Sequence, residues 1–178
     1  MPKPTGPNPH DPKLPYYETE PFGMDFFRTA RERHVAHATC ACTPAQLFEI
    51  FEDEVSWTKW PIGITGVEWT SPRPLGKGAT RIVRMAGGFE IYETFFAWEP
   101  GRELAFHITG ETQPVWSRFG EHYQVEDLGG GRCRLTWTVA FDPRDTFARI
   151  QFLMRPLMAA GFKLYMRRLE KLAARWGK

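Results

Sequence analysis

The feature that most constrains the fold is a series of short segments between residues 65 and 141 that are separated by glycine and proline. Alternating apolar and polar side chains predict β-strands at 65–71, 79–85, 89–98, 103–111, 116–126 and 132–141. The links between them include Gly87-Gly88, Pro100-Gly101 and Gly129-Gly130-Gly131, which suit tight chain reversals. Six strands with such short links predict an antiparallel meander.

Two further kinds of element flank this meander. Residues 32–42 read as a first strand, and a helix follows with Thr43 as N-cap, Pro44 at its first position and Gln46 completing a capping box. A second short helix is expected near Val55–Lys59. The C-terminal region predicts a long helix that Pro156 starts or kinks, with one apolar stripe of Met154, Met158, Phe162, Tyr165, Leu169, Leu172 and Trp176.

The N-terminal region is different in character. Residues 1–21 hold seven of the fifteen prolines, so we expect an extended tail that forms neither a helix nor a strand ladder. Phe22, Phe26 and Phe27 are expected to dock this tail. The predicted organisation is a Pro-rich N-terminal extension over residues 1–30 and one folded domain over residues 31–178.

Composition narrows the class of protein. The chain has 178 residues, a net charge of +2, and 42% hydrophobic residues, values typical of one globular domain. Its three cysteines form no C-x-x-C motif, so neither a disulfide framework nor a zinc site is indicated. Without a secretion signal or an apolar run long enough to cross a bilayer, a cytoplasmic location is expected. No cofactor, metal or nucleic-acid partner is expected.

Charge is distributed unevenly along the chain. The segment from Pro143 to Lys178 contains nine Lys or Arg residues and two acidic residues, which gives it +7 and leaves about −5 for the rest. Such a basic helical end either faces an acidic partner or a membrane surface, or is a solvated helix face.

The order of elements resembles that of the START/SRPBCC superfamily, which includes lipid-transfer domains and birch-pollen-allergen-like proteins. Within it, residues 32–176 look most similar to the polyketide cyclase/dehydrase family. The motifs that carry this resemblance include Trp57-Thr58-Lys59-Trp60-Pro61, Leu75-Gly76-Lys77-Gly78-Ala79 and Trp98-Glu99-Pro100-Gly101-Arg102-Glu103-Leu104. The resemblance implies an α+β helix-grip fold, in which a seven-stranded curved antiparallel sheet surrounds the long C-terminal helix, with two short helices after the first strand.

The same resemblance implies a cavity between sheet and helix. Members of the family bind lipids, polyketides or other hydrophobic molecules there, and a minority catalyse cyclisation or dehydration. No invariant catalytic set can be transferred to this chain. The residues expected to contact a small hydrophobic ligand are Trp57, Trp60, Phe95, Phe106, Phe119, Glu121, Tyr123, Trp137, Met158, Phe162 and Tyr165.

Strand register predicts which side chains face the helix. Pairing apolar with apolar residues in the last hairpin sets Val125 opposite Leu135, Tyr123 opposite Trp137, and Phe119 opposite Phe141. Glu121 then falls on the apolar face. The preceding hairpins add Leu104, Phe106 and Ile108, and then Ile91, Glu93, Phe95 and Ala97.

Glu93 and Glu121 are therefore two carboxylates on an apolar face, and they are the candidate catalytic residues. Each could contact a ligand or act as a general acid or base with a raised pKa. Alternatively, each forms an ion pair with an arginine (Arg81, Arg84 or Arg118), or the register is wrong and it is exposed.

Histidines offer a weaker signal. The same register places His107 and His122 on the outer face, where a solvent-facing pair is a better interpretation than a metal or catalytic site. His34 and His37 lie on opposite faces of one strand, so they are not expected to share a metal.

Three functions remain open from sequence: a binding protein for a hydrophobic small molecule, a cyclase or dehydratase, and an interaction module with a filled core. The space between sheet and helix should separate them. An open apolar cavity with no converging polar groups favours binding. A cavity on which Glu121, Glu93 and an arginine converge favours catalysis, and the absence of a cavity favours the interaction module.

Overall fold

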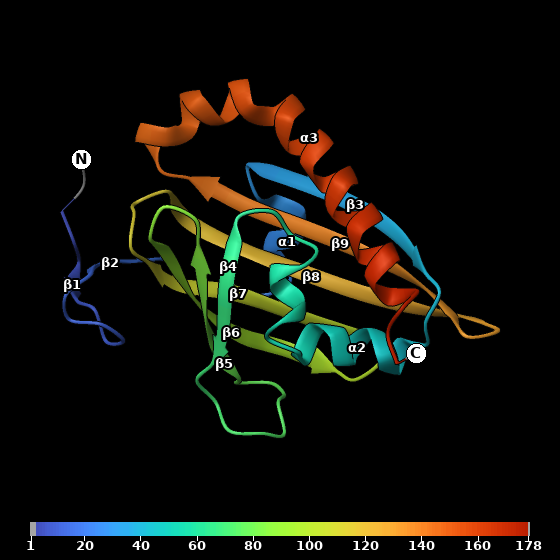
Figure 1. Cartoon of the computed structure of the whole chain (residues 1–178). Coiled ribbons are helices and arrows are strands. Elements are labelled where there is room, and N and C mark those ends of the chain that lie inside the picture. The colour runs from blue at the N-terminus through green and yellow to red at the C-terminus, as the bar shows by residue number, and fades with distance from the viewer. Residues whose placement is uncertain (1–2, 178) are drawn as a thin grey trace.

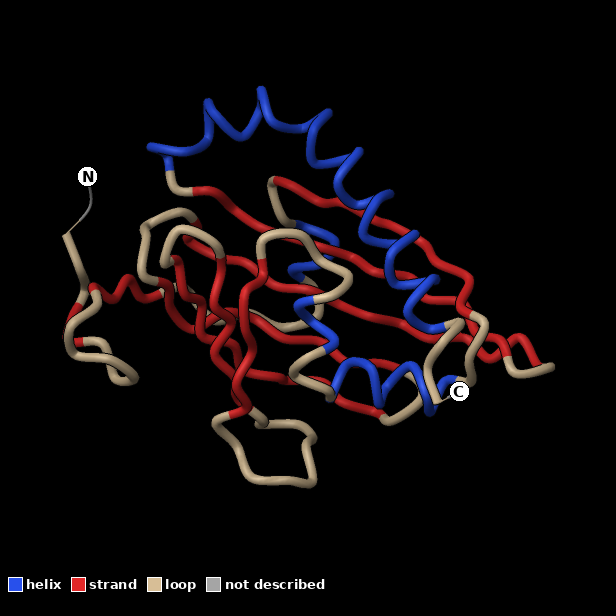
Figure 2. The backbone as a smooth tube through the Cα atoms, viewed as in Figure 1, coloured by secondary structure: helices blue, strands red, loops and turns tan. Residues whose placement is uncertain are grey.

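A computed structural model of the chain describes residues 3–177, without the side chains of 146–155 and 157. Seven strands form a curved antiparallel sheet in the order β3-β9-β8-β7-β6-β5-β4, and one long helix lies across its concave face (Figures 1 and 2). This arrangement confirms the predicted helix-grip fold. The strands are β3 (Glu32–Cys40), β4 (Ile64–Trp69), β5 (Thr80–Met85), β6 (Phe89–Glu99), β7 (Glu103–Glu111), β8 (Trp116–Gly129) and β9 (Arg132–Pro143).

Two short helices connect β3 to β4 as predicted. In α2 (Pro44–Glu52), the Thr43 side chain accepts a hydrogen bond from the Gln46 backbone N–H, and the Gln46 side chain accepts one from the Thr43 N–H. This is the predicted capping box, which pairs backbone N–H groups that a helix leaves free at its start. The second helix is the single 3₁₀ turn η1 (Ser56–Thr58).

The long helix α3 runs from Asp145 to Ala173. Pro156 therefore lies inside the helix and does not start it, and the helix axis bends along its length (Figure 1). Leu169 of the predicted stripe is buried against the sheet, as is Met166, which the predicted stripe did not include. Met158, Phe162 and Tyr165 of the stripe pack beside them. The side chain of Met154 lies outside the described residues.

The prediction that residues 1–21 form no strand ladder is wrong. Strand β1 (Gly6–Pro7) pairs with β2 (Pro15–Glu18), and β2 pairs with β7. Strand β8 pairs with β7 only as far as His107, so the last residues of β7 have a free edge, and β2 takes it. Pro15 is compatible with this pairing because it is the first residue of β2, where a missing backbone N–H is tolerated.

Two strand glycines make room for the N-terminal extension. A Cβ atom at Gly110 would lie 2.2 Å from the ring of Tyr16, and one at Gly120 would lie 2.6 Å from the ring of Phe22. Next to Phe22, the short helix α1 (Phe26–Thr29) buries Phe26 and Phe27 against the convex face of the sheet. The extension is thus packed onto the sheet through aromatic side chains, as predicted for Phe22, Phe26 and Phe27.

The predicted register of the last hairpin is confirmed, because Val125 pairs with Leu135, Tyr123 with Trp137, and Phe119 with Phe141. One predicted inward residue is wrong. A bulge between Phe95 and Ala97 turns Ala97 to the outer face, where it packs near Phe26 and Phe27. A bulge leaves no periodic signal in the sequence.

Candidate functional site

A cavity of about 260 Å³ lies between the concave face of the sheet and α3. Its walls are mainly aromatic and aliphatic. The residues that line it are Trp57, Trp60, Pro61, Ile62, Ile64, Arg81, Val83, Met85, Ile91, Glu93, Phe106, Trp116, Phe119, Glu121, Tyr123, Trp137, Val139, Phe141, Met158, Phe162 and Tyr165. The core of this protein is therefore not filled, which counts against the interaction module.

All but one of the sequence-predicted ligand contacts lie on this wall, together with Glu93. The exception is Phe95, which is fully buried against Trp69, Trp98 and Phe106. It faces the same way as the cavity residues but lies deeper in the packed core. That the other residues bind a ligand remains a prediction.

Sequence reasoning missed several lining residues. Val83 lies two positions from Arg81 on β5 and so faces the same way, but the sequence left open whether Arg81 or Arg84 points inward. Pro61 and Ile62 carry no comparable signal because they lie in the connection between η1 and β4. Such connections reach the cavity only through tertiary structure.

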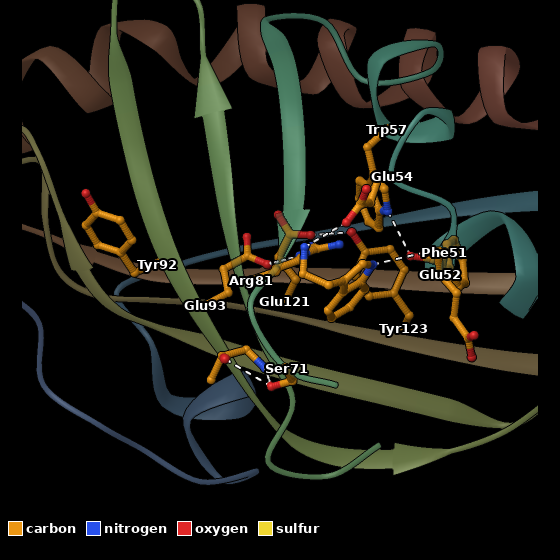
Figure 3. Close-up of polar contacts among 12 residues, drawn as sticks. Phe51, Glu52, Glu54, Trp57, Ser71, Arg81, Tyr92, Glu93, Glu121 and Tyr123 are labelled. Atoms are coloured by element: carbon orange, nitrogen blue, oxygen red, sulfur yellow. Dashed lines mark hydrogen bonds and ion pairs between the residues drawn. The ribbon is translucent and has the colours of Figure 1, made fainter. Parts of the chain in front are cut away.

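The first polar feature of the cavity is the pair of Arg81 on β5 and Glu93 on β6. These residues are cross-strand partners, and the Arg81 Nε–H donates a hydrogen bond to Glu93 (Figure 3). The two side chains are 2% and 3% exposed. Burial raises the pKa of Glu93, and the guanidinium of Arg81 acts against that rise. Of the arginines left open, Arg81 thus points inward.

Arg84 and Arg118 have other partners. Arg84 bonds Glu68 and Glu90, and Arg118 bonds Asp142. Neither lines the cavity.

Aromatic rings surround the Arg81 guanidinium. Its central carbon lies 4.1 Å from the ring centroid of Trp57 and 5.2 Å from that of Phe106. Contacts of a cation with ring faces are favourable when water is excluded. The Nη1 atom nevertheless has no hydrogen-bond partner among the described residues. The site thus retains hydrogen-bonding capacity on a buried cation.

The second polar feature is Glu121 on β8. One of its oxygens, Oε2, accepts a hydrogen bond from the Tyr123 hydroxyl (Figure 3). The same oxygen accepts a second hydrogen bond from the Trp137 Nε1–H at 3.0 Å. No cation forms an ion pair with Glu121 among the described residues, and the carboxyl group lines the cavity. The predicted ion pair with an arginine therefore holds for Glu93 but not for Glu121.

This environment changes the proton affinity of Glu121. Burial raises its pKa to about 7, with the nearby charge of Glu93 adding to the rise, while Arg81 and the two hydrogen-bond donors oppose it. The same burial, and the proximity of Glu121, raise the pKa of Tyr123. Since Oε2 already accepts two hydrogen bonds, a proton on Glu121 belongs on the other oxygen. Near neutral pH this group can either donate or accept a proton.

The histidines lie on the outer face, but the predicted solvent-facing pair is wrong. The His107 ring lies 5.5 Å from that of Phe22. His122, which is 7% exposed, contacts Phe27 and bonds Glu103 at 2.9 Å. The two are not opposite each other, because Gly120 pairs with His107. The N-terminal extension covers both, which local sequence does not reveal.

The described residues contain no cluster of His, Cys, Asp and Glu side chains that could hold a metal ion. The three cysteines are buried free thiols. Among the helices that the structure describes, none combines the length and apolar character of a membrane span.

A curved antiparallel sheet, a long helix and an apolar cavity between them make up the fold of START/SRPBCC-type proteins. Residues 32–177 match the family described as polyketide cyclase / dehydrase and lipid transport. The chain belongs to this family, as the sequence motifs predicted.

Curated relatives are similar to this chain in sequence, and solved structures are similar to it in fold. Uncharacterised proteins of Mycobacterium tuberculosis and Mycobacterium bovis are 38% identical over 155 residues, covering 87% of this chain and 92% of each relative. The aromatase/cyclase Zhui from Streptomyces shares the fold with a TM-score of 0.58 at 16% identity, covering 79% of this chain and 94% of Zhui. A START superfamily protein from Mycobacterium smegmatis has a TM-score of 0.62 at 10% identity, and the match covers 79% of this chain and 98% of that protein.

Proposed function

We propose that this protein binds a small hydrophobic molecule in the cavity between the sheet and α3. The observation that carries the proposal is the cavity itself. It is lined by tryptophan, phenylalanine and methionine side chains, with only a few polar groups. Apolar pockets with a small number of placed polar groups are the usual form of small-molecule sites.

The size of the cavity indicates the size of the ligand. In another protein, an apolar cavity of about 150 Å³ binds benzene. A cavity of about 260 Å³ is larger by a factor of about 1.7, which suits a molecule of about two fused rings. The flat walls of Trp57 and Trp137 favour a planar body.

A second candidate function is catalysis, and the convergence of Glu93, Arg81 and Glu121 on the cavity favours it. A carboxyl group with a pKa of about 7 can remove a proton from a carbon next to a carbonyl group. The electron pair of the broken C–H bond then moves onto the carbonyl oxygen, and the charge of Arg81 stabilises that oxygen.

Binding can be tested with the neutral dye N-phenyl-1-naphthylamine, whose fluorescence rises in apolar surroundings. We expect the wild type to bind it and Phe162→Trp to weaken binding at least tenfold, because added bulk at this position fills the cavity. Lys171→Trp is the matched control, since it places the same residue on the exposed face of α3. Equal binding by both variants and the wild type would place the dye elsewhere and contradict the proposal.

Catalysis has a separate readout. We expect the wild type to accelerate deuterium exchange at the α-carbons of 2-tetralone, a two-ring ketone, as followed by NMR. The rate should rise with pH through about 7 as Glu121 loses its proton. Glu121→Gln should bind 2-tetralone but leave exchange at the rate in buffer. Exchange by the wild type at the buffer rate would favour binding alone.

A further inference from the structure

The edge strand β3 offers unused backbone groups. It pairs only with β9, in unbroken register from Glu32 to Cys40, and its other edge lies beside α3 (Figure 1). The Thr39 N–H points to this free edge, where it donates a hydrogen bond of 2.9 Å to the Glu170 carboxylate. The direction of backbone groups alternates along an antiparallel strand. The N–H and C=O groups of Arg33, Val35 and His37 therefore point to the same edge as Thr39.

These backbone groups on the outer edge of β3 lack hydrogen-bond partners among the described residues. The backbone N–H and C=O of Arg33, Val35 and His37 form no further hydrogen bond among the described residues. Val35 is also 38% exposed, which is high for an apolar β-branched side chain in a strand. A row of unpaired backbone groups on a flat edge is a template for another strand.

A groove runs along this edge. It has a volume of about 640 Å³, and α3 forms its second wall with Ala159, Phe162, Lys163, Met166, Arg167 and Glu170. The four steps from Arg33 to His37 span about 14 Å at the rise of a strand. The eleven steps from Ala159 to Glu170 span about 16 Å at the rise of a helix. Both walls thus match an extended chain of about five residues.

The charge of the groove indicates which kind of segment can bind there. Lys163 and Arg167 line it with two positive charges against one from Glu170, which leaves a net charge of one positive unit, whereas the guanidinium of Arg33 is turned to the Phe27 carbonyl. Lys163 and Arg167 have no ion-pair partner among the described residues. An acidic segment complements this surface, whereas a second copy of the chain would bring two positive grooves together.

We infer that an extended acidic segment of a partner protein binds in this groove and adds to the sheet as a strand beside β3. Its backbone pairs with Arg33, Val35 and His37, which supplies affinity without regard to sequence. Its acidic side chains on the α3 side meet Lys163 and Arg167. The groove shares Phe162 with the ligand cavity, but its backbone edge and its charged residues lie outside that cavity, so the inference does not depend on the proposed function.

The test uses a fluorescein-labelled octapeptide of alternating Glu and Val, followed by fluorescence anisotropy at low salt. We expect saturable binding that weakens as salt rises, and no binding of the matching Lys-Val peptide. Arg167→Glu should weaken binding at least tenfold. Lys77→Glu is the matched control, because it makes the same charge change on an exposed loop away from the groove.

Strand addition has its own test. Val35→Pro removes one edge N–H and should weaken binding at least tenfold, whereas Val35→Thr keeps that N–H and should bind like the wild type. Two octapeptides, one N-methylated at its valines and one at its glutamates, serve if Val35→Pro lowers the melting temperature, since one of them blocks the edge that faces β3 without changing the protein. We expect one of the two to bind at least tenfold more weakly.

Three outcomes would overturn the inference. The first is no binding of the Glu-Val peptide at millimolar concentration. The second is binding that is lost in Arg167→Glu but unchanged by N-methylation, which would show adsorption by charge alone. The third is a dimer by light scattering that Val35→Pro dissociates, which would show that a second copy occupies the edge.

Discussion

Glu121 gives the sharpest prediction, because its environment makes folding stability depend on pH in a way that one substitution removes. Glu121→Gln keeps the shape of the side chain and an oxygen that accepts from Tyr123 and Trp137. It removes the ionisable group. The variant therefore isolates the contribution of one carboxyl from the rest of the protein.

The magnitude follows from the shift in pKa. Glu121 rises from 4.5 to about 7 on folding, a change of about 2.5 units, which corresponds to roughly 3 kcal/mol. Below about pH 4.5 the group is protonated in both states and has no effect. As pH rises to about 7, the unfolded chain loses this proton while the folded protein keeps it, so stability falls. Above about 7 the loss is complete.

Urea unfolding of wild type and variant at matched pH values measures this difference. The difference in the free energy of unfolding between the two proteins at about pH 4.5 serves as the reference. By about pH 8.5 we expect this difference to change by roughly 3 kcal/mol in favour of Glu121→Gln. Glu111, whose pKa burial raises to about 8, titrates in both proteins and cancels in the comparison. Carboxyl NMR of the wild type would report the pKa directly.

A difference between the two proteins that stays constant across this pH range would refute the reasoning. It would mean that water reaches the carboxyl group freely, so that Glu121 titrates like an ordinary glutamate. The catalytic candidate would then lose its base, while ligand binding by the apolar walls would be unaffected.

Three other substitutions test the packing around the site. Arg81→Ala should lower the free energy of unfolding by about 3–5 kcal/mol in urea titrations, because it leaves Glu93 buried without its cation. The double variant with Glu93→Leu should recover most of that loss. A double variant as unstable as Arg81→Ala would contradict the ion-pair account. Gly110→Ala should release the N-terminal extension, seen as faster proteolysis ahead of residue 20, because its Cβ would clash with Tyr16. Adding Tyr16→Ala to Gly110→Ala should remove that clash and so restore the pairing of β2 with β7, which is measured by hydrogen exchange. Phe162→Trp should shift the melting temperature by only a few degrees while blocking dye binding. A large shift in melting temperature with unchanged dye binding would show that Phe162 is a packed core residue and not part of a cavity wall.

The sequence by itself determined most of the fold. Period-two alternation and glycine turns gave the strands, because exposure alternates along a strand and tight turns require special backbone angles. Apolar matching gave the register of the last hairpin, since a slip by one residue would turn Val125, Tyr123 and Phe119 to solvent. That register was enough to place Glu121 on the inner face.

Only the tertiary structure decided the rest, because it depends on contacts between segments far apart in the chain. The choice of Arg81 over Arg84 as the partner of Glu93 depends on cross-strand pairing and on the direction of the side chain. The bulge that turns Ala97 outward and the burial of His122 under Phe27 likewise have no local signal. Burial of Glu121 without an ion-pair partner, which sets its pKa, emerges only when sheet, helix and loops enclose the cavity together.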